Sequence, residues 1–197
     1  TGFENEDDET VLTGALARAA GETVGTYAIN QGALSAGDNY TIDFTGADFT
    51  ITKKTLTVTV DAGQSKVYGQ SDPTFTYEVT GFENEDDETV LTGTLARAAG
   101  ETVGTYAINQ GTLSAGDNYE ISFTGADFAI TKATLTVTVD ENQSKVYGEA
   151  DPTFTYEATG FENEDDETVL TGALARAAGE AVGTYAINQG TLSAGDN

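Results

Sequence analysis

The chain has 197 residues, with 33 Asp or Glu against 8 Lys or Arg, and its formal charge is −25. It contains no His and no Cys, which excludes a Ser–His triad, a thiolate nucleophile and the usual zinc sites. Such a charge repels nucleic acid and anionic lipid, and no apolar run is long enough to span a membrane. We therefore expect a protein that is not an enzyme, binds no nucleic acid, does not insert into a membrane and needs no organic cofactor.

The chain is an array of one repeated unit. The motif Thr-Gly-Phe-Glu-Asn-Glu-Asp-Asp-Glu begins at Thr1 and recurs with a constant period at Thr80 and Thr159. A unit that starts on a strand and ends on one gives a complete domain over 54–132. Residues 1–53 are then the C-terminal part of a first domain, and residues 133–197 are the N-terminal part of a third. We expect the chain to be a stretch of a longer array.

Within one unit, alternation of apolar and polar residues predicts strands. Leu56, Val58 and Val60 alternate with threonines, and the segments in between are rich in Gly, Asp and Asn. The same alternation recurs at 75–79, 106–108, 119–123 and 128–130. The predicted fold is mostly β, made of small β-sandwich or β-grasp-like domains in tandem.

One segment, 86–100, is ambiguous. Val90, Leu91 and Leu95 fit a helical stripe, but Gly93 lies among them and is a poor helix former. We expect one short helical turn over 86–91, followed by a strand over 92–98.

Neighbouring units are joined without a flexible linker. The junction Ile130-Thr131-Lys132-Ala133-Thr134-Leu135 contains neither Gly nor Pro, so one strand leads almost directly into the next. This predicts an extended, semi-rigid rod.

Several motifs recur at matched spacings: Lys145-Val146-Tyr147-Gly148, Asp151-Pro152 and Val103-Gly104-Thr105-Tyr106. Together they resemble the MBG-type repeat of the Tyr-Gly-x variety, found in tandem in very large bacterial surface adhesins. The resemblance covers essentially the whole chain and implies a mostly-β stalk module outside the cell, at the bacterial surface. Tyr68, in the corresponding motif of the second repeat, is interpreted as a buried aromatic residue beside a turn.

An acidic loop recurs in every repeat and is more acidic than the loop of the family it resembles. Clustered carboxylate and amide oxygens are ligands that Ca²⁺ accepts, which makes the loop a candidate calcium site. The simpler interpretation, which the sequence favours, is a solvated loop that keeps the protein soluble. The candidate metal ligands are Glu83, Asn84, Glu85, Asp86, Asp87 and Glu88, with counterparts Glu4, Glu6, Asp7, Asp8 and Glu9, and Glu162, Glu164, Asp165, Asp166 and Glu167.

A covalent cross-link is a second hypothesis, because some adhesin domains join a Lys to an Asn. Lys66 and Lys132 would be the amines, and Asn109 and Asn118 the partners. The simpler interpretation is that Lys66 pairs with the acidic surface. Arg97 is likewise expected to pair with the acidic loop.

The preferred function is a structural stalk of an extracellular bacterial adhesin or surface filament, extending a distal adhesive region. Two alternatives stay open: repeats that bind a glycan or surface weakly and multivalently, and self-assembly into a filament by strand complementation. The expected partners are neighbouring repeats or identical chains. A glycan or surface ligand would be reached through other parts of the parent protein.

Overall fold

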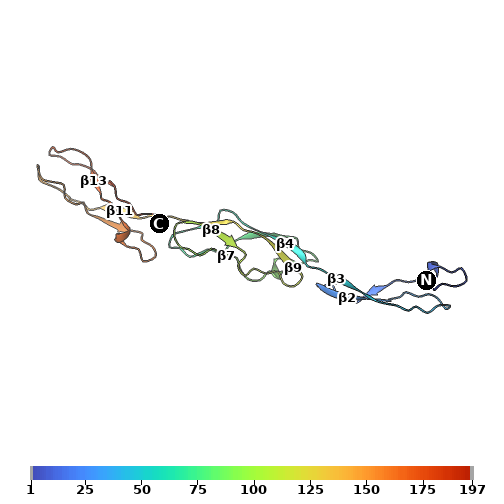
Figure 1. Cartoon of the computed structure of the whole chain (residues 1–197). Coiled ribbons are helices and arrows are strands. Elements are labelled where there is room, and N and C mark those ends of the chain that lie inside the picture. Colours follow the sequence, from blue (N-terminus) through green and yellow to red (C-terminus); the bar gives the residue numbers. More distant parts are fainter. Residues whose placement is uncertain (1, 196–197) are drawn as a thin grey trace. The chain divides into compact units, whose positions relative to one another are not determined.

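The computed structural model describes residues 2–195 and is mostly β (Figure 1). Its helical elements, within those residues, are three short 3-10 turns, one in each repeat: η1 (Glu9–Val11), η2 (Glu88–Val90) and η3 (Glu167–Val169). The predicted fold class, tandem β repeats with one helical turn each, is confirmed. The expected outer ends of the first and third domains, Thr1 and Asn197, lie outside the described residues. Nowhere in 2–195 is there a helix long and apolar enough to cross a membrane.

The strands repeat with the sequence. The first repeat contains β1 (Ala17–Arg18), β2 (Gly25–Asn30) and β3 (Ala47–Ile51). The second contains β4 (Lys54–Val60), β5 (Ser65–Val67), β6 (Tyr77–Thr80), β7 (Ala96–Arg97), β8 (Gly104–Asn109), β9 (Tyr119–Thr124) and β10 (Asp127–Thr131). The third contains β11 (Thr136–Val139), β12 (Tyr156–Thr159), β13 (Ala175–Arg176) and β14 (Ile187–Asn188).

The chain divides into two compact units, and each combines parts of two adjacent repeats. The first unit comprises residues up to Val58, Val79–Gly93 and Thr112–Thr124. The second comprises Thr59–Glu78, Thr94–Gly111 and the residues from Gly125 onward. The 54–132 domain frame, whose residues fall in both units, stays a prediction.

The first unit contains an antiparallel sheet in the order β1-β2-β3 and most of a second sheet in the order β6-β4-β9. Alternation in β4 places Leu56 and Val58 at zero exposure and its threonines at the surface, as predicted. The core joins Leu56 to Ala115 and Tyr119, with Val79, Phe82, Val90, Leu91 and Ile121 packed against it.

The second unit is organised around β10. This strand pairs in parallel with β5 and antiparallel with β8, giving the sheet order β5-β10-β8-β7. Phe128 and Ile130 of β10 are buried, and Phe75 meets the edge of the Phe128 ring at a centroid distance of 5.3 Å. Two smaller antiparallel pairs, β11-β12 and β13-β14, belong to the same unit.

The ambiguous segment forms the predicted helical turn at Glu88–Val90, but the strand after it is shorter than predicted. Thr92 makes one isolated bridge with Ser114, and β7 covers only Ala96–Arg97. Gly93 explains the interruption: its φ is +82°, and a side chain there would collide with the backbone of Thr112.

Candidate functional site

The acidic loop of the second repeat folds as a tight turn followed by a helix cap. The Asp86 amide donates to the Glu83 carbonyl at 3.0 Å, and Asn84 and Glu85 between them have φ values of 54° and 68°. Two consecutive left-handed residues define a type I′ turn. Asp87 then caps η2 by accepting the Thr89 amide at 2.9 Å. Hydrogen bonds from the Thr89 hydroxyl and amide lower the pKa of Asp87.

Two carboxylates of this loop are engaged by residues outside it. Glu83 accepts the Lys54 ammonium at 2.6 Å, and this hydrogen bond raises the pKa of Lys54. Asp86 accepts the Tyr119 hydroxyl at 2.6 Å, which raises the pKa of that buried tyrosine. The Tyr119 oxygen in turn accepts the Glu83 amide at 3.1 Å. The loop is thus held by structural contacts at both ends of its turn.

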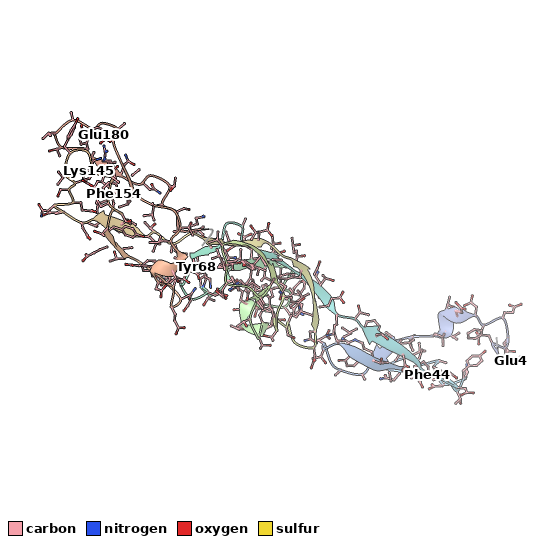
Figure 2. The ribbon with its side chains drawn as sticks, turned by 60° about the vertical axis from the view of Figure 1, so that its left-hand side comes forward. Glu4, Phe44, Tyr68, Lys145, Phe154 and Glu180 are labelled. Carbon is pink, nitrogen blue, oxygen red and sulfur yellow. The ribbon has the colours of Figure 1, made fainter. Side chains whose placement is uncertain are left out.

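The same aspartate meets a tyrosine in every repeat. In the first repeat, the Tyr40 hydroxyl donates to Asp7 at 2.8 Å and accepts the Glu4 amide at 2.8 Å. Asp165 of the third repeat accepts the hydroxyl of Tyr68 at 3.0 Å; this tyrosine belongs to the second repeat and is not the counterpart of Tyr40 and Tyr119 (Tyr68 is labelled in Figure 2). We call this recurring contact the tyrosine latch.

The remaining loop residues point to no common centre. Asn84, Glu85 and Glu88 are exposed, and residues 2–195 contain no group of three or more His, Cys, Asp or Glu side chains placed to hold a metal ion. The calcium hypothesis for this loop, and for its counterparts in the other repeats, stays a prediction.

The most developed polar cluster lies elsewhere, in the second unit. Lys66 on β5 lies 2.8 Å from Asp72 and also pairs with Glu101, although its side chain is only 5% exposed. Arg97 on β7 pairs with the same two carboxylates, at 2.7 Å and 2.5 Å. We call Lys66, Asp72, Arg97 and Glu101 the charge cluster.

Each cation of this cluster is compensated. Burial alone would lower the pKa of Lys66, but hydrogen bonds to Asp72 and Glu101 outweigh it and raise that pKa. The Arg97 hydrogen bond, acting against burial and assisted by Lys66, lowers the pKa of Asp72. The Arg97 guanidinium also lies over the rings of Tyr106 and Phe128, at 5.1 Å and 5.5 Å. The cluster has the features of a structural tie between β5, β7 and the turn at Asp72.

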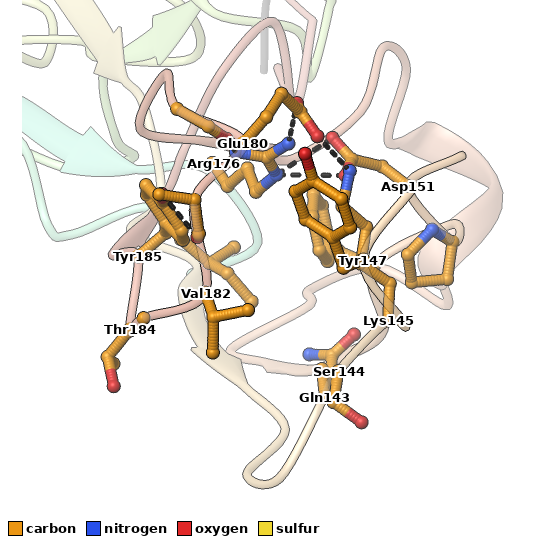
Figure 3. A pocket seen from close by; sticks show the side chains of 16 residues that line it. Gln143, Ser144, Lys145, Tyr147, Asp151, Arg176, Glu180, Val182, Thr184 and Tyr185 are labelled. Atoms are coloured by element: carbon orange, nitrogen blue, oxygen red, sulfur yellow. Dashed lines mark hydrogen bonds and ion pairs between the residues drawn. The ribbon is translucent and has the colours of Figure 1, made fainter. Parts of the chain in front are cut away.

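The third repeat carries the same cluster, formed by Lys145, Asp151, Arg176 and Glu180 (Figure 3). Lys145 is 2.9 Å from Asp151, and Arg176 is 2.8 Å from it. The described part of the first repeat has only the Arg18–Glu22 pair of this cluster.

The charge cluster differs in one pairing from what the sequence predicts. The predicted partner of Arg97 was wrong: it binds Asp72 and Glu101, not the acidic loop. Lys66 does pair with surface carboxylates, as expected. Asp72 and Glu101 were not predicted as partners, although Lys, Asp-Pro, Arg and Glu recur at constant spacing in the second and third repeats and this recurrence is a signal for them.

The residues of the cross-link hypothesis have other partners. The Asn109 side-chain oxygen accepts the Gly111 amide at 3.0 Å, and that of Asn118 accepts the Val24 amide at 3.0 Å. Lys132 donates to the carbonyl of Gly195 at 2.9 Å. The cross-link stays a prediction. Tyr68, by contrast, is buried beside its turn as predicted.

Tandem β repeats, each tied by its own polar contacts, define this chain as a β-repeat protein. The family model of the MBG domain (YGX type) matches residues 1–50, 56–129 and 135–197, and the chain belongs to that family. No curated protein matches the chain, and no solved structure does.

Proposed function

We propose that this chain is a non-enzymatic stalk segment of an extracellular bacterial adhesin or surface filament. Its repeats would act as spacers that extend an adhesive region away from the cell. The partners of each repeat are then its neighbours in the array, and any glycan or surface ligand is bound by other parts of the parent protein.

The observation that carries this proposal is that consecutive repeats contact one another directly. In the first unit, Asn118 of the second repeat accepts the amide of Val24 from the first at 3.0 Å. Lys53 of the first repeat also donates to the Tyr119 carbonyl of the second at 3.3 Å, and just after the junction, within the second repeat, the Lys54 amide donates to the Asn118 carbonyl at 3.0 Å. The junction between these repeats is therefore fixed by hydrogen bonds on both of its sides.

The second unit contains a comparable junction with different residues. Tyr68 of the second repeat makes the tyrosine latch with Asp165 of the third. Gly69 has a φ of +85°, and a side chain on it would collide with Glu162, so glycine permits this approach. Direct contacts of this kind restrict bending at a junction, which is what a spacer needs.

The charge is consistent with the same role. Acidic residues recur with the repeat, so like charges are distributed along the chain and oppose its folding back on itself. Screening limits this effect to about 8 Å at physiological salt. The contacts at the junctions would therefore contribute more to stiffness than the charge does.

Hydrogen exchange by mass spectrometry tests the proposal on the intact chain. Peptides covering the two junctions are distinguishable because Lys54 corresponds to Ala133. We expect junction amides to exchange as slowly as those of neighbouring strands. Asn118→Ala should accelerate exchange at Val24, whereas the exposed neighbour Asp117→Ala should not. Junction amides that exchange as fast as free loops in the unsubstituted protein would contradict a stiff spacer.

A further inference from the structure

Strand β10 lies inside the sheet of the second unit and pairs in parallel with β5, which forms one edge of that sheet. At the beginning of this ladder, the Ala129 amide donates to the Gln64 carbonyl at 3.0 Å. At its other end, the Tyr68 amide donates to the Thr131 carbonyl at 2.8 Å. The Thr131 hydroxyl adds a hydrogen bond to the Lys66 carbonyl at 3.2 Å. Hydrogen bonds therefore hold the ladder at both of its ends.

The two strands of this ladder are connected to opposite sides of the chain. β5 is reached from β4, which begins the second repeat, whereas β10 ends that repeat and leads into the third. Tension along the chain thus enters β5 at Ser65 and leaves β10 at Thr131. These are opposite ends of the ladder, because Ser65 lies opposite Ala129 and Thr131 lies opposite Val67. Such a load acts along the ladder and reaches its evenly spaced hydrogen bonds together, whereas a load at one end breaks them one after another.

The turn that connects β4 to β5 is fixed by one side chain. The Gln64 amide group donates to the carbonyls of Asp61 and Thr76, at 2.9 Å and 3.0 Å. Its side-chain oxygen accepts the Thr76 amide at 2.9 Å, and the Asp61 amide donates to the Thr76 carbonyl at 3.1 Å. Because these hydrogen bonds restrict extension of the turn, a pull on β4 is passed to the first residue of β5.

The charge cluster holds β5 against the rest of the sheet. Lys66 is the middle residue of β5, and its ammonium group pairs with Asp72 and Glu101. Both carboxylates also bind Arg97 of β7, the strand at the opposite edge of the sheet. The Arg97 guanidinium lies over the ring of Phe128, on β10. The ion pairs therefore connect the two edge strands across β10 and oppose the peeling of β5.

We propose that the β5–β10 pair is a mechanical clamp, which makes the second repeat resist extension when the chain is pulled along its length. Both strands and the charge cluster lie within the second unit, so the clamp is a property of that unit. It adds load bearing to the spacer role and rests on the proposed function only for the source of the tension.

Single-molecule force spectroscopy on the intact chain tests the clamp. The chain contains no Cys, so introduced cysteines allow force handles to be attached at chosen residues. One handle is at Lys132→Cys, directly after β10, in every variant. The second handle is at Ser65→Cys or at Val67→Cys. Both positions are exposed and lie on β5, so the two variants differ in which end of that strand is loaded.

A handle at Ser65 loads the ladder along its length, and a handle at Val67 peels it from the end opposite Thr131. We expect the Ser65 variant to extend at a force roughly twofold to threefold higher at the same loading rate, because three residue pairs share the load instead of one. A third variant, with its second handle at Lys53→Cys, loads the whole second repeat as neighbouring repeats would. Its extension force should be close to that of the Ser65 variant.

The matched control is Val67→Ser in the Ser65 variant, which should keep the higher force. A fall to the force of the Val67 variant would mean that the Val67 side chain, and not the direction of the load, sets the strength, and would overturn the proposal. Equal forces for the Ser65 and Val67 handles would also overturn it. The same holds for a Lys53 variant that extends at the force of the Val67 variant, since the clamp would then not bear the tension of the chain.

Failure of the clamp is distinguishable from failure of the stalk proposal, because the two tests report on different contacts. Equal forces in a chain whose junction amides exchange slowly would overturn the clamp alone. A higher force for the Ser65 handle in a chain whose junction amides exchange as fast as free loops would support the clamp and contradict the stiff spacer.

Discussion

The ammonium group of Lys66 lies 2.8 Å from a carboxylate oxygen of Asp72 while the Lys66 side chain is 5% exposed. A buried cation so close to its partner depends on that partner, because removing one member leaves a charge without compensation. Lys145 and Asp151 make the same pair in the third repeat, but there the lysine is 21% exposed. The two repeats therefore contain the same ion pair with two different degrees of burial of its lysine.

We predict that Asp72→Ala destabilises its surroundings by about 3 kcal/mol, because the substitution leaves Lys66 and Arg97 undercompensated. Asp151→Ala should cost less, since water reaches Lys145. The measurement is native-state hydrogen exchange at Ala98 for Asp72→Ala and at its counterpart Ala177 for Asp151→Ala, because their amides donate to the carbonyls of Ala107 and Ala186 beside the two clusters. Asp117→Ala is the control. Equal effects of the two cluster substitutions would contradict a dependence on burial.

The charge cluster also predicts a loss of stability in acid. Hydrogen bonds from Lys66 and then Arg97 lower the pKa of Glu101, and Arg97 lowers that of Asp72. A carboxyl group with a lowered folded-state pKa stabilises the fold above its unfolded pKa, and this stabilisation is lost as pH falls through the folded pKa. Melting temperature should therefore decrease below about pH 4. Asp72→Asn should be less stable than wild type at neutral pH and should show a shallower decrease in acid; an unchanged acid profile would contradict the prediction.

The tyrosine latch predicts a local effect. Tyr119→Phe removes the hydroxyl that donates to Asp86 at 2.6 Å and should weaken docking of the acidic loop by about 1.5–3 kcal/mol. Cleavage by a glutamate-specific protease at Glu83, Glu85 and Glu88 should then be faster than in wild type. Tyr77→Phe, on β6, is the control for loss of a tyrosine hydroxyl. An unchanged cleavage rate in Tyr119→Phe would show that the hydroxyl does not hold the loop.

The type I′ turn predicts a stabilising substitution. Glu85 has a φ of 68°, which costs a residue with a side chain roughly 1–2 kcal/mol, and glycine avoids this cost at some expense of chain entropy. Glu85→Gly should therefore raise stability by about 0.5–1 kcal/mol, seen as a higher urea midpoint. Glu88→Gly, in the 3-10 turn, should lower it. A destabilising Glu85→Gly would indicate that the glutamate side chain has a role that its exposure does not reveal.

Calcium should have little specific effect on this protein. Glu83 and Asp86 already have partners, and the exposed carboxylates around them, within the described residues, do not converge. We expect the same melting temperature in millimolar calcium as in magnesium at equal ionic strength. A rise confined to calcium, abolished by EDTA and by Asp86→Asn, would instead establish the calcium site.

Local patterns predicted part of this structure, and long-range contacts determined the rest. Alternation in Leu56, Val58 and Val60 correctly predicted a strand with one buried face, because that signal is contained in adjacent residues. β5, at Ser65–Val67, was missed because so short a strand shows no period, and its partner β10 begins only at Asp127. Parallel pairing between strands so far apart in the sequence produces no recognisable pattern in the residues of either β5 or β10.

The polar contacts show the same limit. In the sequence, the acidic loop is one run of similar negative charges. In the structure, Tyr119 donates a hydrogen bond to Asp86, whereas Lys54 donates one to Glu83. Those partners lie on β9 and β4, so only the fold distinguishes Asp86 and Glu83 from their neighbours. Likewise, the sequence offers many acidic residues as partners for Arg97. Arg97 pairs with Asp72 because the fold places Asp72 beside β5, where it also pairs with Lys66.

The claim that this chain is a stiff spacer is tested most directly by small-angle X-ray scattering from the intact protein, measured over a range of concentrations and extrapolated to zero concentration. A compact protein of this length has a radius of gyration of about 16 Å. We predict a value at least roughly 1.5 times larger, with the pair-distance distribution of a rod, an early peak and a long tail. A symmetric distribution with the radius of gyration of a compact protein would contradict the proposed function.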